Sequence, residues 1–164
     1  MEIEEYLENK GMGYENLSDG ERKAISNFAL IWSLFEAQLL GESASARKIL
    51  QRSQEWVNGR GIDETLVDDY LNYFKGRYVE DDGFGYRFDH LHLRANDNEQ
   101  LVRDVLLGNE NALENKLACC LIIILRFRNN YFHGIKWAYQ FREQQENFER
   151  SCCLLTWCLD KYAR

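Results

Sequence analysis

The sequence contains no proline, no long apolar run and little positive charge, and each shortage excludes a class of protein. None of the 164 residues is proline, against roughly 5% in an average protein. Because proline breaks helix interiors, its absence favours long uninterrupted helices. The longest wholly apolar run, residues 117–125, is much shorter than the roughly 20 residues that a spanning helix needs. We therefore do not expect the protein to associate with a membrane.

Acidic residues outnumber basic ones, 27 to 20, which gives a net charge of −7. This balance argues against a general nucleic-acid coat protein, since such affinity comes from neutralising phosphates. The basic segment, residues 126–142, is the exception, because it contains Arg126, Arg128, Lys136 and Arg142 and only hydrophobic or uncharged residues otherwise. A polyanion is expected to bind there, on an otherwise acidic body.

The cysteines and the N-terminus point to the cytoplasm. The five cysteines, at positions 119, 120, 152, 153 and 158, lack Cys-x-x-Cys spacing, so we expect reduced, buried side chains and no zinc or other cofactor. Residues 1–5 are acidic, whereas a secretory signal begins with positive charge. A cytoplasmic location is therefore expected.

Helical periodicity dominates the chain and predicts an all-α, antiparallel helical bundle. We expect a single domain over residues 1–164, with an irregular N-terminal segment over residues 1–17. The first long helix starts at Ser18, where Ser18 and Glu21 form a capping box. Residues 79–97 are expected to be less regular, with residues 86–93 extended. The predicted helices span residues 18–40, 43–58, 63–78, 98–107, 111–130 and 136–162.

Two charged residues fall on the apolar faces of predicted helices. Glu36 lies in the middle of the stripe formed by Ile25, Phe28, Ala29, Trp32, Phe35 and Leu39. Arg128 continues the row of Leu113, Leu117, Leu121 and Ile124, whereas Arg126 points to the opposite side. Because a buried carboxylate needs a partner, we predict that Glu36 and Arg128 form a pair. A purely structural salt bridge is the alternative interpretation.

A histidine follows this arginine closely. His133 lies five residues after Arg128, just past the predicted helix end, and the intervening Asn129 and Asn130 favour a turn. Histidine moves protons near neutral pH, and arginine matches two phosphate oxygens with its planar fork. An RNA 2′-hydroxyl supplies a nucleophile that needs no metal. The alternative is a hydrogen-bonded structural histidine.

The segment Arg128-Asn129-x-x-x-His133 resembles the Arg-x(4–6)-His motif of the HEPN family, and residues 31–36 are similar to the first helix of small HEPN proteins. The resemblance implies a compact helical bundle that cuts RNA without metal, as a toxin of a toxin–antitoxin pair or in phage defence. It also implies a homodimer in which two motifs share one cleft, and a cognate antitoxin protein as a further partner. Residues 30–40 are apolar nearly all round, as an additional interface requires.

The resemblance assigns a role to each motif residue. His133 is expected to act as general acid or base, Arg128 to bind the scissile phosphate, Asn129 to orient the phosphate or the motif, and Glu36 to position Arg128; Arg126 and Lys136 are candidate RNA-backbone contacts. A second copy of the spacing, Arg87 to His92, includes Asp89 and is interpreted as coincidence. The alternative functions are a non-catalytic HEPN-like RNA- or protein-binding module and a structural helical dimer.

Overall fold

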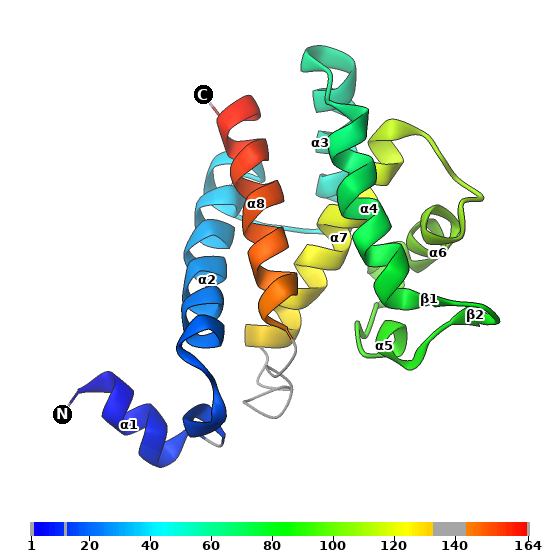
Figure 1. The fold of residues 1–164 in the computed structure, drawn as a ribbon. Helices are drawn as coiled ribbons and strands as arrows, with labels where there is room; N and C mark the ends of the chain where they lie inside the picture. The colour runs from blue at the N-terminus through cyan, green and yellow to red at the C-terminus, as the bar shows by residue number, and fades with distance from the viewer. Residues whose placement is uncertain (1, 12, 133–143, 164) are drawn as a thin grey trace.

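α-Helices account for nearly all of the regular structure in the computed structural model, which describes residues 2–11, 13–132 and 144–163 (Figure 1). The predicted all-α helical bundle is confirmed. The helices are α1 (Ile3–Lys10), α2 (Asp19–Leu39), α3 (Ala46–Arg60), α4 (Glu64–Tyr78), α5 (Tyr86–Asp89), α6 (Glu99–Leu107), α7 (Leu113–Phe132) and α8 (Gln145–Tyr162). Short 3-10 turns at Tyr14–Asn16 and Ala95–Asp97 and an antiparallel pair of strands, β1 (Val79–Glu80) and β2 (Gly83–Phe84), lie between them.

Helix α7 forms the centre of the bundle. Each residue from Leu117 to Leu125 is at least 98% buried, because α3, α4 and α6 all pack against this helix. A helix that is apolar on every side needs such complete cover. Helices α2 and α8 lie side by side (Figure 1), and Phe28 meets Phe148 between them with ring centroids 4.9 Å apart.

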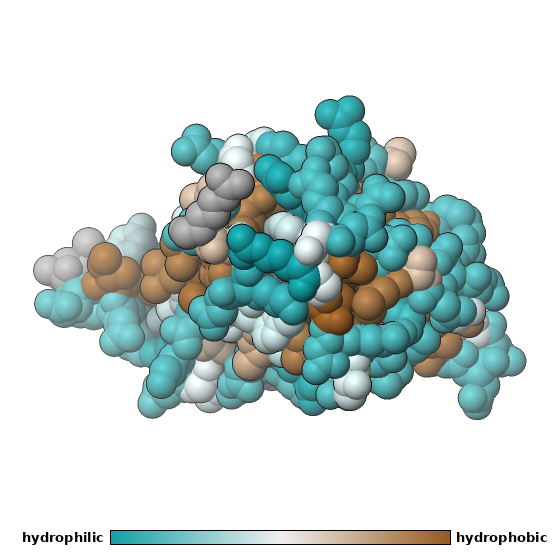
Figure 2. All heavy atoms as spheres, turned by 90° about the horizontal axis from the view of Figure 1, so that it is seen from above, coloured by the Kyte–Doolittle hydropathy of each residue, from teal (hydrophilic) through white to brown (hydrophobic). Residues whose placement is uncertain are grey.

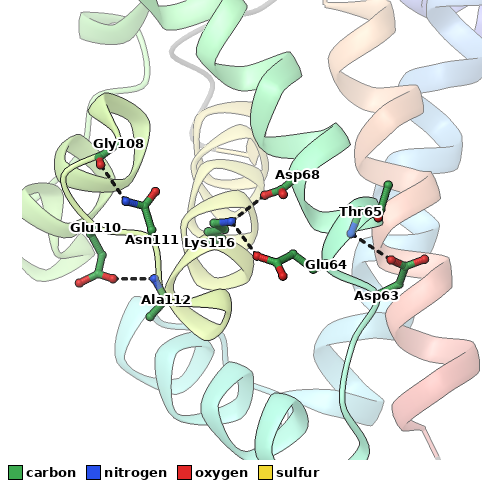
Figure 3. A network of polar contacts seen from close by, with 9 residues as sticks. All are labelled: Asp63, Glu64, Thr65, Asp68, Gly108, Glu110, Asn111, Ala112 and Lys116. Carbon is green, nitrogen blue, oxygen red and sulfur yellow. Dashed lines mark hydrogen bonds and ion pairs between the residues drawn. The ribbon is translucent and has the colours of Figure 1, made fainter.

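Side-chain caps start the long helices where the sequence predicts them. At the start of α2, the Glu21 backbone N–H donates to the Ser18 hydroxyl over 3.2 Å, and the Glu21 carboxylate accepts from the Ser18 backbone N–H over 2.8 Å. The capping box is thus confirmed. At the start of α4, the carboxylate of Asp63 accepts from the backbone N–H of Thr65 over 2.9 Å (Figure 3).

Lys116 joins the first turn of α7 to α4. Figure 3 shows its ammonium group between two carboxylates of α4, 3.1 Å from Glu64 and 2.9 Å from Asp68. The hydrogen bond to Asp68 raises the pKa of Lys116. The turn before α7 is closed by Glu110, whose carboxylate accepts from the Ala112 backbone N–H over 2.7 Å. These contacts set the position of α7 against α4 at the end opposite the basic segment.

The structure departs from the predicted fold at two short helices, α1 and α5. Residues 1–17 were expected to be irregular, yet residues 3–10 form α1, which buries none of its residues and projects from the bundle (Figure 1). Residues 86–93 were expected to be extended, but residues 86–89 form α5, whose Phe88 is buried. The less regular character of residues 79–97 is confirmed, and residues 136–143 of the last predicted helix lie outside the described residues.

The surface of the described residues is largely hydrophilic. Seen from above, apolar atoms are confined to a band across the middle and to the side of α1, with hydrophilic atoms around them (Figure 2). Within the described residues, we find no helix that has both the length and the apolar character needed to cross a membrane.

The cap of α2 yields a stability prediction. We expect Ser18→Ala to lower the free energy of unfolding by about 1 kcal/mol, because the Glu21 backbone N–H loses its acceptor. Urea denaturation followed by circular dichroism measures this loss. Ser26→Ala, an exposed change in the middle of α2, is the control and is expected to have no such cost. Equal losses for the two variants would contradict the role of the cap.

Candidate functional site

The predicted pair between Glu36 and Arg128 is present in the structure. Arg128 lies near the end of α7, and its Nη2 atom is 3.6 Å from Oε2 of Glu36 on α2. The arginine side chain keeps 31% of its surface exposed. The pair therefore lies at the rim of the bundle, where solvent reaches it, and not in the sealed core.

The Glu36 carboxylate is held in place from both sides. Its Oε2 atom accepts from the Trp32 indole N–H over 3.3 Å, one helical turn earlier. Its Oε1 atom accepts from the backbone N–H of Ala44, in the connection between α2 and α3, over 2.8 Å. Glu36 thus links α2, the following connection and α7 through one half-buried group, which explains how a carboxylate is tolerated on this helix face.

Asn129 is the second partner of the same guanidinium. Its side-chain oxygen accepts from Nη1 of Arg128 over 3.0 Å. The Arg128 fork therefore has Asn129 at one terminal nitrogen and Glu36 at the other. A hydrogen bond at one terminal nitrogen and an ion pair at the other restrict rotation of the guanidinium, and an oriented, solvent-accessible guanidinium is a good receptor for phosphate.

The predicted RNA contact at Arg126 is wrong. This side chain is only 1% exposed, since it points to the side of α7 that residues 90–97 cover. Its Nε donates to the Leu91 carbonyl over 3.1 Å, and its Nη1 lies 3.3 Å from Oδ2 of Asp97. Burial lowers the pKa of Arg126, and the charge of Asp97 opposes that shift. Arg126 is an internal cation and does not reach a polyanion at the surface.

Asn130 completes this internal network. Its side-chain oxygen accepts from Nη2 of Arg126 over 3.0 Å, and its amide donates to the Leu91 carbonyl over 3.0 Å. Asp97 in turn accepts from the Arg94 backbone N–H over 2.8 Å. The last turns of α7 therefore bind the main chain of residues 90–97. Sequence reasoning missed Asp97, although an arginine on a covered helix face is a signal that an acidic partner exists.

Two of the predicted site residues, His133 and Lys136, lie outside the described residues, as does Arg142. The second copy of the spacing is separate from the Arg128 pair. Arg87 belongs to α5, and His92 follows it with a backbone φ of +50°. Both side chains are exposed.

The other polar features of the described residues include no metal centre. Among these residues, no group of three or more His, Cys, Asp or Glu side chains is placed to hold an ion. Cys119, Cys120 and Cys158 are buried as predicted, and burial raises the pKa of Cys120 to about 12. The other two correct the prediction, because Cys152 is only partly buried and Cys153 is exposed.

An open hollow of about 500 Å³ lies away from the Arg128 pair. Its lining residues are Arg77, Arg87, Gln145, Glu146 and Glu149. The two glutamates on one wall repel a phosphate, so this hollow does not replace the Arg128 pair as an anion site.

Comparison with known proteins adds no assignment. No family model, no curated protein and no solved structure matches the chain.

The two arginines of α7 are expected to differ sharply in their contribution to stability. We expect Arg126→Ala to lower the free energy of unfolding by about 3–5 kcal/mol, because it leaves the buried Asp97 without its counter-charge. Arg128→Ala is expected to cost about 1 kcal/mol or less, since its pair is partly exposed and long. Urea denaturation of both variants tests this. Similar losses would mean that Arg128, too, is mainly a structural residue.

Proposed function

We propose that this protein is a metal-independent endoribonuclease of the HEPN type, with Arg128 and His133 as its catalytic pair, acting as a toxin or phage-defence effector. The observation that supports it is the Arg128 guanidinium, which Glu36 and Asn129 hold at the rim of the bundle. The same helix end leads into residue 133, five positions later in the chain.

The proposed reaction is an internal transfer within RNA. The 2′-hydroxyl loses its proton and attacks the adjacent phosphorus, and the bond from phosphorus to the 5′-oxygen of the next nucleotide breaks. The leaving oxygen takes up a proton, so the products are a 2′,3′-cyclic phosphate and a 5′-hydroxyl. His133 moves one of these protons as general acid or base. Arg128 stabilises the negative charge that develops on the phosphoryl oxygens.

The geometry around Arg128 suits this task. At 3.6 Å, the contact from Nη2 to Glu36 is longer than a charge-assisted hydrogen bond of about 2.7–2.9 Å. A phosphate oxygen can therefore compete for this nitrogen, while Trp32 and Ala44 keep the carboxylate in place. In this proposal Glu36 is a positioning residue, and Asn129 orients the other side of the fork.

A non-catalytic RNA- or protein-binding module is the second candidate. The net charge of −7 favours it, and the burial of Arg126 removes one cation from the basic segment. The third interpretation, a purely structural pair, fits less well with an Arg128 side chain that keeps 31% of its surface exposed, because ion pairs that solvent reaches contribute little to stability.

The nuclease proposal is tested by cleavage of a long, mixed-sequence RNA with purified protein. We expect His133→Ala and Arg128→Ala each to slow cleavage by at least about 100-fold, and a chelator to leave the wild-type rate unchanged. Arg52→Ala is the control, since it removes another exposed arginine that pairs with a glutamate, Glu55. Undiminished cleavage by His133→Ala, or loss of wild-type activity with chelator, would exclude the mechanism.

We also propose that two copies of the chain assemble through the outer face of α2. Leu30 and Leu34, one helical turn apart, are 71% and 44% exposed. Residues 24–35 include no charged side chain, and depletion of charge is typical of interface cores. Leu39 and Leu40, the last of the apolar residues 30–40, are buried within the domain and do not extend this face.

The assembly is tested by sedimentation velocity and by cleavage. We expect Leu30→Glu combined with Leu34→Glu to convert the dimer to a monomer, because two carboxylates cannot be buried without partners, and to lower the rate of RNA cleavage. Leu107→Glu changes another exposed leucine, on α6, and is the control. A wild-type protein that sediments as a monomer, or a double variant that stays dimeric, would contradict this interface.

A further inference from the structure

A row of exposed rings lies on α5 and the turn that follows it. Tyr86 is 63% exposed, and its ring centroid lies 5.9 Å from that of His90. His90 is in turn 6.2 Å from His92. The Arg87 guanidinium lies 5.7 Å from the centre of the Tyr86 ring. We propose that this ring row, Tyr86, His90 and His92 with Arg87 beside it, binds bases of single-stranded RNA by stacking.

The ring row has a fixed support. Phe88, between its members, is buried and stacks on Phe84 with ring centroids 4.1 Å apart. The Arg103 guanidinium of α6 lies within 5 Å of the centres of both phenyl rings, at 4.9 and 4.7 Å. Because these side chains hold the backbone of α5 in place, binding of a ligand to the exposed rings does not require the helix itself to become ordered.

The charge of the protein favours bases over phosphates as the bound groups. Asp89 lies within the ring row, and Glu80, Asp81 and Asp82 lie at the neighbouring strand turn, all exposed. Such surroundings weaken binding that depends on phosphate neutralisation. Stacking on a neutral base does not need a net positive surface, and side chains of Tyr, His and Arg all offer suitable planes.

The ring row and the Arg128 pair belong to the same end of the bundle. Helix α5 lies near the C-terminal end of α7 (Figure 1), and Asn130 donates to the carbonyls of Leu91 and His90 over 3.0 and 3.4 Å. Arg128 projects from the other side of this helix end. The ring row and the Arg128 pair therefore lie on opposite sides of the last turns of α7.

This inference rests on the proposed function for the identity of the polymer, and it names single-stranded RNA as the substrate class. Arg128 and His133 contact one phosphodiester step, which every sequence shares. Flanking nucleotides must then supply most of the affinity, and duplex RNA does not expose base faces for stacking.

The test uses a fluorescently labelled single-stranded DNA oligonucleotide, which lacks the 2′-hydroxyl and so stays intact. We expect Tyr86→Ala to weaken its binding by roughly 5- to 100-fold in fluorescence anisotropy, and Tyr86→Phe to retain the affinity. Tyr6→Ala is the matched control, because Tyr6 on α1 is also well exposed, at 49%, and is expected to bind as the wild type does. Duplex RNA of the same length should show no difference among these variants.

The outcomes separate this inference from the nuclease proposal. Binding by Tyr86→Ala that equals the wild type, an equal loss for Tyr6→Ala, or no binding of the oligonucleotide by the wild type would overturn the ring row as a binding surface. RNA cleavage that depends on His133 would survive each of these results. Conversely, loss of binding in Tyr86→Ala by a protein that cuts no RNA would support the ring row and reject the nuclease.

Discussion

The structure depends on one buried charge, the guanidinium of Arg126, in the central helix α7. A cation with 1% of its surface exposed requires compensation inside the protein, which comes from the ion pair with Asp97 and from hydrogen bonds to the Asn130 side chain and the Leu91 carbonyl. Meeting that need brings residues 90–97 against the end of α7. Because residues two apart on a helix point about 200° away from each other, covering Arg126 on one side also turns Arg128 toward α2.

The two arginines therefore have different properties, because a single side chain cannot be both fully buried and accessible to a ligand. Full burial gives Arg126 a fixed position and removes it from any ligand. Partial exposure leaves Arg128 accessible, and Glu36 and Asn129 restrict its guanidinium. Glu36 is itself fixed by Trp32 and Ala44, so the guanidinium is oriented by a group that does not move with it. Such orientation before binding is what a phosphate receptor needs, since less freedom is lost when the ligand arrives.

Helical periodicity was sufficient to predict the Glu36–Arg128 pair and the start of α2 at Ser18, because both depend on spacing within regular helices and on the cost of an isolated buried charge. The partner of Arg126 could not be predicted this way. Asp97 lies in an irregular segment, which has no helical periodicity from which its direction could be predicted. Periodicity places Arg126 on the side of α7 opposite Arg128, but it does not predict which residues cover that side. Helix α1 was missed although Ile3, Tyr6 and Leu7 have helical spacing, because the helix has only eight residues and buries none of them against the bundle.

The low positive charge of the chain is compatible with an RNA substrate if one surface binds the bases and another stabilises the reacting phosphate. In the proposed function, one oriented guanidinium stabilises one phosphate, and the exposed rings of Tyr86, His90 and His92 hold neutral bases nearby. Few phosphates are then neutralised, so the affinity for RNA should depend only weakly on salt. An acidic body also repels duplexes and long polyanions that approach elsewhere. Acidity, which at first argues against a nucleic-acid partner, in this arrangement confines RNA to the end of the bundle where α5 and α7 meet.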